Sequence, residues 1–433
     1  MMECATPSLS VCPPHLSPWV ALPVLFVAAW AWPGGGDECM TLCNEHGPYI
    51  LDRIYGVRQS LRAVLCLIDP MSTAKYRSLT PHSSDVHVFH CAAAANAKPL
   101  PEEKITLGFE HVNAPVLVGK CRHESNAVKC AALTAYCDQV KMPGFAVQFL
   151  RAGIVQALYA SVADADGTTR TLVAKAFGAT TRAPNGTEKI VEVGIEKIAP
   201  LVDDRERSVR TTVYDALEII CKSMKGNSAA VKAGFVSIMI QKCATEEGSL
   251  QPVCLRVLYT LLQCPGGHSL VEARENGGIR GMIALLKHDQ DAVKEYASKC
   301  LALLCDHIEP KGIAINAGAV SVLTNDYLSS SNNRVVSGGA CALMGLLTEL
   351  QGKTEFMNNG GTEKLVDLLL QNPDRMVQLH ILKSISSLAP HPVARKMMNV
   401  EVVVNRLKDM EYGTDKLLSK SARKTLELIQ WVP

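Results

Sequence analysis

Aromatic side chains are scarce in this sequence: Phe, Trp and Tyr together make up 5% of its 433 residues. Because apolar residues nonetheless reach 48%, the core has to be built mainly from Leu, Ile, Val and Ala. β-Sandwiches favour aromatic and β-branched residues, whereas small aliphatic side chains allow helices to pack closely. The composition therefore favours an all-α fold.

Net charge is almost absent as well. The chain has 44 basic and 42 acidic residues, which leaves a formal charge of +2 at pH 7. Proteins that bind nucleic acid obtain much of their affinity from an excess of Lys and Arg over Asp and Glu. We therefore expect no nucleic-acid partner.

Motifs for catalysis and metal binding are missing too. The sequence contains no GxxxxGK[ST], no nucleophile elbow and no HExxH. Most of the 16 cysteines lie in apolar helical runs, as Cys300 and Cys305 do, and Cys39 and Cys43 have no second pair at zinc spacing. We expect reduced core cysteines, with disulfides and a metal site as the less favoured alternatives. No enzymatic activity, cofactor or small-molecule substrate is expected.

A run of apolar residues long enough to span a membrane is not found near the amino terminus. The stretch from Trp19 to Trp32 is interrupted by Pro23 and is shorter than the ~20 residues that a span needs. No Lys or Arg precedes it, as a signal peptide would require. We expect residues 1–103 to be a poorly ordered leader or a mis-annotated one, with the true translation start at Met71 in the second case. A functional signal or anchor is the alternative.

What the sequence does contain is a repeat of about forty residues. In residues 209–220, apolar side chains occupy positions 0, 4, 7, 8 and 11, which lie on one side of an α-helix. We call these five positions the stripe and number each copy from its first residue. Copies start at Val128, Thr169, Val209, Val253, Val293, Val335, Val377 and Leu418. Successive starts are 40 to 44 residues apart, which is the spacing of a repeat protein.

A glycine precedes most stripes by about sixteen residues. These glycines are Gly153, Gly194, Gly234, Gly278, Gly318 and Gly361. Glycine permits a sharp turn between two helices, and polar residues such as Asp203 and Asp204 separate the second helix from the stripe. Each unit is therefore predicted to be helix, glycine turn, helix, short acidic loop and long helix. About eight such units are expected over residues 104–433.

This unit resembles the armadillo repeat. The shared pattern is G-[IVA]-x-x-L-x-x-L-L-x-D, followed by V-[RK]-x-x-A-x-x-A-L-x-x-L. The resemblance implies an all-α, right-handed superhelical solenoid whose function is to bind other proteins. HEAT repeats, which share the same helix-pair design, are the alternative.

One surface of the long helix is the candidate binding groove. Positions 3, 6 and 10 point away from the stripe, and in armadillo proteins that bind extended peptides position 10 is typically asparagine. Here position 10 is occupied by Asp138, Ala179, Ile219, Gln263, Leu303, Gly345, Ser387 and Leu428. The missing asparagines argue against an import receptor.

Positions 3 and 6 supply the candidate partner-binding residues. They are Lys175, Asp215, Arg256, Tyr259, Tyr296, Lys299, His380 and Lys383. Tyr and Arg are over-represented among interface anchors. An ordinary solvated helix surface is the alternative for each of these positions.

The carboxyl-terminal units carry a more specific resemblance. Residues 361–370, 377–390, 394–396 and 431–433 are similar to the end of the armadillo-repeat radial spoke proteins. This resemblance implies a structural subunit in the axoneme of a cilium or flagellum, within the cytoplasm and cytoskeleton, with other radial spoke subunits as partners. A cytosolic armadillo adaptor or chaperone unrelated to cilia is the alternative.

Overall fold

The computed structural model describes residue 105 and residues 113–432. By its internal contacts the chain divides into two units, residues 1–99 and 100–433, and the description below concerns the second. The leader expected over residues 1–103 lies outside the described residues. Within the described part of the chain, no helix is both long and apolar enough to cross a membrane.

The described residues form helices and no strands, arranged in repeated units of three. The first helices of the units are α8 (Pro143–Arg151), α11 (Gly186–Val193), α14 (Met224–Lys232), α17 (His268–Glu275), α20 (Ile308–Asn316), α23 (Leu350–Asn358) and α26 (Pro392–Met398). The second helices are α6 (Ala114–Lys120), α9 (Ile154–Ala160), η1 with α12 (Ile195–Ile198, Ala199–Val202), α15 (Phe235–Thr245), α18 (Gly278–Leu285), α21 with η2 (Ala319–Val322, Leu323–Tyr327), α24 (Gly361–Gln371) and α27 (Glu401–Glu411). This order confirms the predicted all-α repeat architecture.

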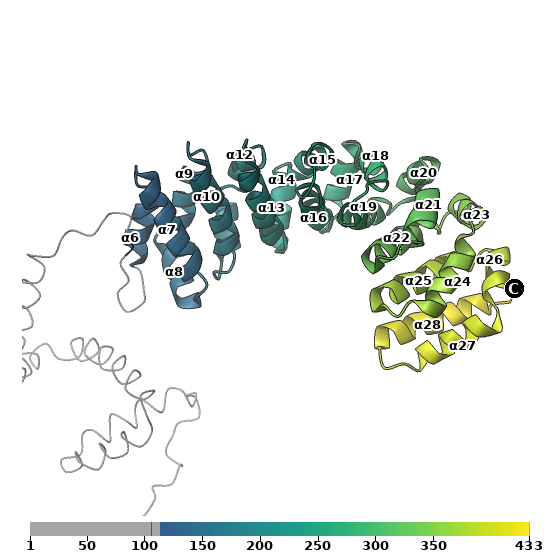
Figure 1. The fold of residues 1–433 in the computed structure, drawn as a ribbon. Coiled ribbons are helices and arrows are strands. Elements are labelled where there is room, and N and C mark those ends of the chain that lie inside the picture. The colour runs from purple at the N-terminus through teal and green to yellow at the C-terminus, as the bar shows by residue number, and fades with distance from the viewer. Residues whose placement is uncertain (1–104, 106–112, 433) are drawn as a thin grey trace, which may run out of the picture. The chain divides into compact units, whose positions relative to one another are not determined.

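The long third helix of each unit contains the stripe. These helices are α7 (Asn126–Gln139), α10 (Gly167–Thr180), α13 (Arg207–Cys221), α16 (Gln251–Leu262), α19 (Asp291–Leu304), α22 (Asn333–Leu346), α25 (Arg375–Leu388) and α28 (Lys416–Ile429). Each packs against the third helix of the next unit, in series from α7 to α28. In Figure 1 they follow the inner side of a curved row, and α12, α15, α18 and α20 lie on its outer side.

Burial of the stripes explains why the units stack. All five stripe positions are buried in α10, α13, α19, α22 and α25, and in α19 each of them is 0% exposed. A single unit cannot cover this apolar side alone, so neighbouring units bury it together and form one continuous core.

In α16 the predicted starting residue of the stripe was wrong. Val253 is only partly buried, whereas Leu250 and Cys254 are fully buried. The observed stripe therefore starts at Leu250, three residues earlier, and moves Arg256 to position 6 and Tyr259 to position 9. The helix is apolar around most of its circumference, so the sequence pattern fits both registers and only the packing distinguishes them.

Two kinds of glycine occur at the turn between the first and second helices. Gly234 adopts a left-handed conformation with φ 78°, which favours glycine. Where two glycines occur together, the left-handed residue is the first, as at Gly360 with φ 66°, and not the predicted Gly361. Gly361 is needed for space instead, because a Cβ there would lie 2.4 Å from the ring of Phe356.

Candidate functional site on the third helices

All eight predicted binding residues lie on third helices. Lys175 is on α10, Asp215 on α13, Arg256 and Tyr259 on α16, Tyr296 and Lys299 on α19, and His380 and Lys383 on α25. None of them is buried. Five lie close together around α16 and α19, whereas Lys175 lies on another part of the row. Their role in binding a partner stays a prediction.

Arg256 links two neighbouring units. Its Nη2 donates to Oδ1 of Asp215 at 2.6 Å, and it also forms an ion pair with Glu218. Asp215 and Arg256 both occupy position 6, one on α13 and the other on α16, so position 6 of adjacent third helices lies on the same side of the row. An arginine held by two carboxylates has a fixed orientation.

Two tyrosines and a lysine continue this surface onto α19. The ring centroids of Tyr259 and Tyr296 are 6.2 Å apart at an interplanar angle of 60°. Lys299 places its Nζ 5.0 Å from the Tyr296 centroid and donates to Glu295 Oε1 at 2.6 Å. Burial raises the pKa of Tyr259, so its hydroxyl keeps its proton and remains a hydrogen-bond donor. These contacts hold the aromatic pair and the cation in defined positions.

A pocket of about 380 Å³ opens beside these residues; we call it the α16 pocket. It is lined by Glu218, Cys221, Lys222, Ser223, Met224, Asn227, Arg256, Tyr259, Thr260, Gln263, Pro265, Tyr296 and Lys299. Four of the predicted residues therefore contribute to one hollow. The pocket is polar at Arg256 and Lys299 and aromatic at the two tyrosines, a combination that suits recognition of a protein side chain or backbone.

The structure adds Asn227 to this site. It lies on α14, is 5% exposed, and donates from Nδ2 to the Thr260 carbonyl oxygen at 2.7 Å. Its Oδ1 is buried and accepts no hydrogen bond within the described part of the chain. A buried acceptor without a donor is costly. Because Asn227 belongs to a first helix, a rule based on third-helix positions could not have found it.

His380 lies further along the row and is tied to α22. Its Nδ1 is 2.9 Å from the hydroxyl of Ser337 and 3.0 Å from the carbonyl oxygen of the same residue. Burial lowers the pKa of His380, and the positive charges of Lys383 and Lys299 lower it further against the opposing effect of the Ser337 hydrogen bond. The imidazole is therefore neutral at pH 7, when Nδ1–H can donate to the carbonyl.

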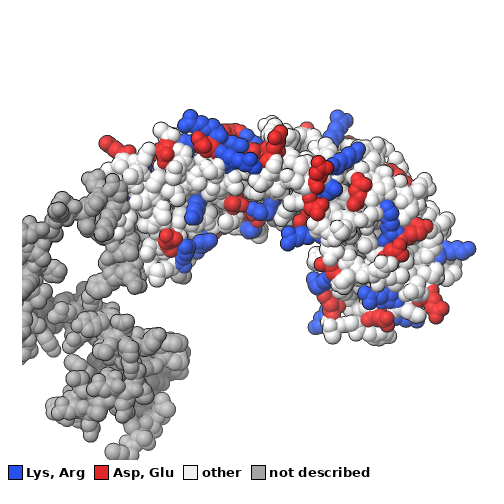
Figure 2. Space-filling model, in the orientation of Figure 1, with Lys and Arg blue, Asp and Glu red and all other residues white. Residues whose placement is uncertain are grey.

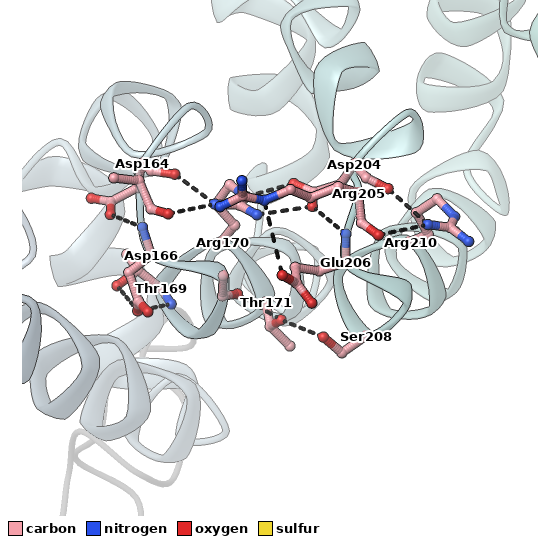
Figure 3. A network of polar contacts seen from close by, with 12 residues as sticks. Asp164, Asp166, Thr169, Arg170, Thr171, Asp204, Arg205, Glu206, Ser208 and Arg210 are labelled. Carbon is pink, nitrogen blue, oxygen red and sulfur yellow. Dashed lines mark hydrogen bonds and ion pairs between the residues drawn. The ribbon is translucent and has the colours of Figure 1, made fainter.

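A separate polar network connects units near the amino-terminal end of the row (Figure 3). The basic residue at position 1 of three successive third helices pairs with an acidic residue of the following unit. The pairs are Lys129–Asp164, Arg170–Asp204 and Arg210–Glu246. We call them the inter-repeat ion pairs. These pairs were not predicted from the sequence. The basic residue of the V-[RK] pattern and the acidic loops of the repeat are the sequence features that could have indicated them.

Arg170 is the most buried basic residue of these pairs. Its Nη2 donates to Asp204 at 2.9 Å, and its Nη1 donates to the carbonyl oxygens of Asp164 and Ala165 at 2.8 and 3.1 Å. Side-chain exposure is 8% for Arg170 and 7% for Asp204. With its donors occupied inside the fold, Arg170 holds units together and is not available to a partner.

The remaining surface is mixed in charge. In Figure 2, Lys and Arg alternate with Asp and Glu over the visible face. The described residues include no cluster of three or more His, Cys, Asp or Glu side chains that could hold a metal ion. Their ten cysteines are unbridged and seven of them are buried. Burial raises the pKa of Cys221 to about 12, which leaves that thiol protonated and unreactive.

Comparisons with known proteins agree with the repeat architecture. No protein-family model matches the chain. The chain is 27% identical over 262 residues to Radial spoke protein 14 of Chlamydomonas reinhardtii, a match that covers 55% of this chain. It covers 64% of that relative, slightly less than two thirds of its length.

Two solved structures match the chain, and the first is similar in fold. A crystal structure of an engineered protein has a TM-score of 0.64 and 23% identity, over 73% of this chain and 78% of that one. A designed armadillo repeat protein has a TM-score of 0.48 and 15% identity, over 54% and 99% of the two chains. The three-helix units with stacked third helices show an armadillo-type solenoid, and the expected resemblance to a radial spoke protein is confirmed at the level of sequence similarity.

Proposed function

We propose that this protein is a structural, non-enzymatic subunit of the radial spoke in the axoneme of motile cilia or flagella. The observation that carries the proposal is the similarity to Radial spoke protein 14, which extends over 262 residues. A solenoid suits such an assembly because each added unit extends the binding surface without requiring a new fold. The action is docking to other spoke subunits, without a covalent step.

The surface we assign to docking is the inner side of the third helices. Asp215, Arg256, Tyr259, Tyr296 and Lys299 form its most defined part, because ion pairs and ring contacts fix their positions. A partner that binds there meets little additional ordering cost, since preorganised side chains lose little entropy on association.

Fractionation of axonemes tests the assignment. We expect the tagged full chain to copurify with spoke subunits in salt extracts of isolated axonemes. A variant with Arg256→Glu, Lys299→Glu and Lys383→Glu should stay soluble and helical but fail to incorporate, because unpaired charge in an interface costs several kcal/mol. The variant Lys232→Glu/Lys287→Glu/Lys396→Glu is the control: these residues are exposed and lie outside the third helices.

The outcome that opposes the proposal is a wild-type chain that is diffuse in the cytosol of ciliated cells and absent from their axonemes. A cytosolic armadillo adaptor or chaperone would then take its place.

A further inference from the structure

Large apolar residues stand exposed at the start of the first helices in the last three units. Ile308 is the first residue of α20, Leu350 is the first of α23 and Val393 is the second of α26. They are 74%, 70% and 55% exposed. Single apolar residues on a surface need no explanation, whereas a row that recurs in successive units marks a contact surface. We call these three residues the apolar edge.

The three helices follow one another along the carboxyl-terminal part of the row (Figure 1). Nζ of Lys311 on α20 donates to Oγ1 of Thr348 at 2.9 Å, just before α23 begins. Nε2 of Gln351 on α23 donates to Oδ1 of Asn316 on α20 at 2.8 Å. Packed helices have axes about 8–10 Å apart, so the apolar edge forms a strip about 16–20 Å long.

Both ends of this strip are widened by a further apolar residue. Ile313 on α20 is 41% exposed and Met397 on α26 is 38% exposed, and each lies five residues after the first residue of its helix. Towards the amino terminus the strip ends, because α17 begins with His268. The strip therefore has apolar residues at both ends and Leu350 at its centre.

The two ends differ in the sign of their unpaired charge. Glu309, beside Ile308, is exposed and forms no ion pair with any described residue. Lys396, beside Met397, is exposed and is also without an ion pair in the described part of the chain. The other charged side chains near the ends already have partners within the fold, in the contacts Asp306–Arg274, Lys311–Glu349 and Arg395–Trp431.

Such a strip is complementary to a second copy of itself turned in the opposite direction. About a two-fold axis near Leu350, α20 of one copy faces α26 of the other, so apolar ends meet apolar ends and Glu309 faces Lys396. At the centre, α23 contributes one further charge of each sign, Lys353 and Glu355. Self-complementary patches are the usual contact of two-fold dimers. A parallel arrangement would instead bring like charges together, which is unfavourable.

We propose that the apolar edge is a dimer interface, on which a second copy of this chain packs in antiparallel orientation. A lipid surface or a helix of another protein would also cover the apolar side chains, but neither accounts for the opposite unpaired charges at the two ends. Small interfaces belong to transient complexes, so we expect a dimer that dissociates on dilution. The interface uses first helices, leaves the inner side of the third helices free, and does not depend on the proposed spoke function.

Sedimentation velocity of the purified full chain tests the inference. From about 1 to 100 µM the wild type should shift from the mass of one chain to twice that mass, as a transient dimer does. Leu350→Glu should raise the dissociation constant at least about tenfold, because two carboxylates then face each other at the axis. Met224→Glu is the matched control and should dimerise like the wild type. Met224 is also the first residue of a first helix and is 73% exposed, but it lies on α14, away from the strip.

Charge reversal tests the antiparallel orientation. Glu309→Lys alone and Lys396→Glu alone should each weaken the dimer about fivefold or more, because each places like charges opposite one another twice in the dimer. The double variant Glu309→Lys/Lys396→Glu restores opposite charges at both contacts. Its dissociation constant should therefore return to within about threefold of the wild-type value.

Three results would overturn the inference: a wild type that stays monomeric at about 100 µM, a dimer that Leu350→Glu leaves intact, or a double variant no stronger than the single ones. The measurement is independent of the axoneme experiment. A monomeric chain that enters the axoneme refutes only the dimer interface, and a dimer that stays out of the axoneme refutes only the spoke assignment.

Discussion

Leu301 occupies position 8 of α19 and is 0% exposed, whereas Lys383 occupies position 6 of α25 and is exposed. Leu301→Ala should lower the free energy of unfolding by about 2–5 kcal/mol, because it removes buried methyl groups and leaves a cavity. Lys383→Ala should change it by no more than about 0.5 kcal/mol. Urea denaturation followed by circular dichroism measures both. Equal effects would mean that the buried side of the third helices has been misassigned.

His380 gives the fold a dependence on pH. Its pKa in the folded chain lies below the ordinary 6.5, mainly because it is buried. Between the two values the unfolded chain binds more protons than the folded one, so stability falls as pH drops through and below 6.5. The urea midpoint of the wild type should therefore fall from pH 7.5 to pH 5.5 by more than that of His380→Gln. Identical pH dependence in the two proteins would contradict this expectation.

At the scale of one element, α22 offers a matched pair of glycines. A Cβ at Gly339 would lie 2.5 Å from Cβ of Tyr327, whereas a Cβ at Gly345 would have its nearest neighbour at 3.7 Å. Gly339→Ala should destabilise the protein by about 1–3 kcal/mol through overpacking. Gly345→Ala should stabilise it by up to about 1 kcal/mol, since alanine favours a helix. Thermal melts measure the stability of the two variants. A change of the same sign in both would contradict the close contact between Gly339 and Tyr327.

The helices of the repeat could be predicted well from the sequence, and the errors in that prediction have physical causes. The stripe at Val293 could be located because its apolar residues are separated by polar ones, whereas α16 is apolar at both Leu250 and Val253 and its register depends on packing. The candidate binding residues were found by position on one helix type. Asn227 escaped because it reaches the α16 pocket from another helix, and such a meeting of helices has no local signature in the sequence.

At the scale of the whole row, each unit packs on its immediate neighbours. The stability of such a protein is close to a sum of unit and interface contributions, so damage stays local. Ile385→Ala, a fully buried change in α25, should speed amide hydrogen exchange in α22, α25 and α28 and leave α7 and α10 unaffected. Exchange followed by mass spectrometry distinguishes this outcome from a uniform increase along the row, which would indicate one global unfolding unit.

The inter-repeat ion pairs have a mechanical consequence. Separating the units of α10 and α13 at Arg170 and Asp204 would leave two buried charges without a partner, which costs several kcal/mol. Near the other end of the row, Arg375 and Asp415 form a pair whose side chains are 55% and 30% exposed, and water screens such a pair. Bending should therefore be stiff from α7 to α16 and more compliant from α19 to α28. Under load, the row should therefore bend mainly between α19 and α28, while the units from α7 to α16 keep their relative positions.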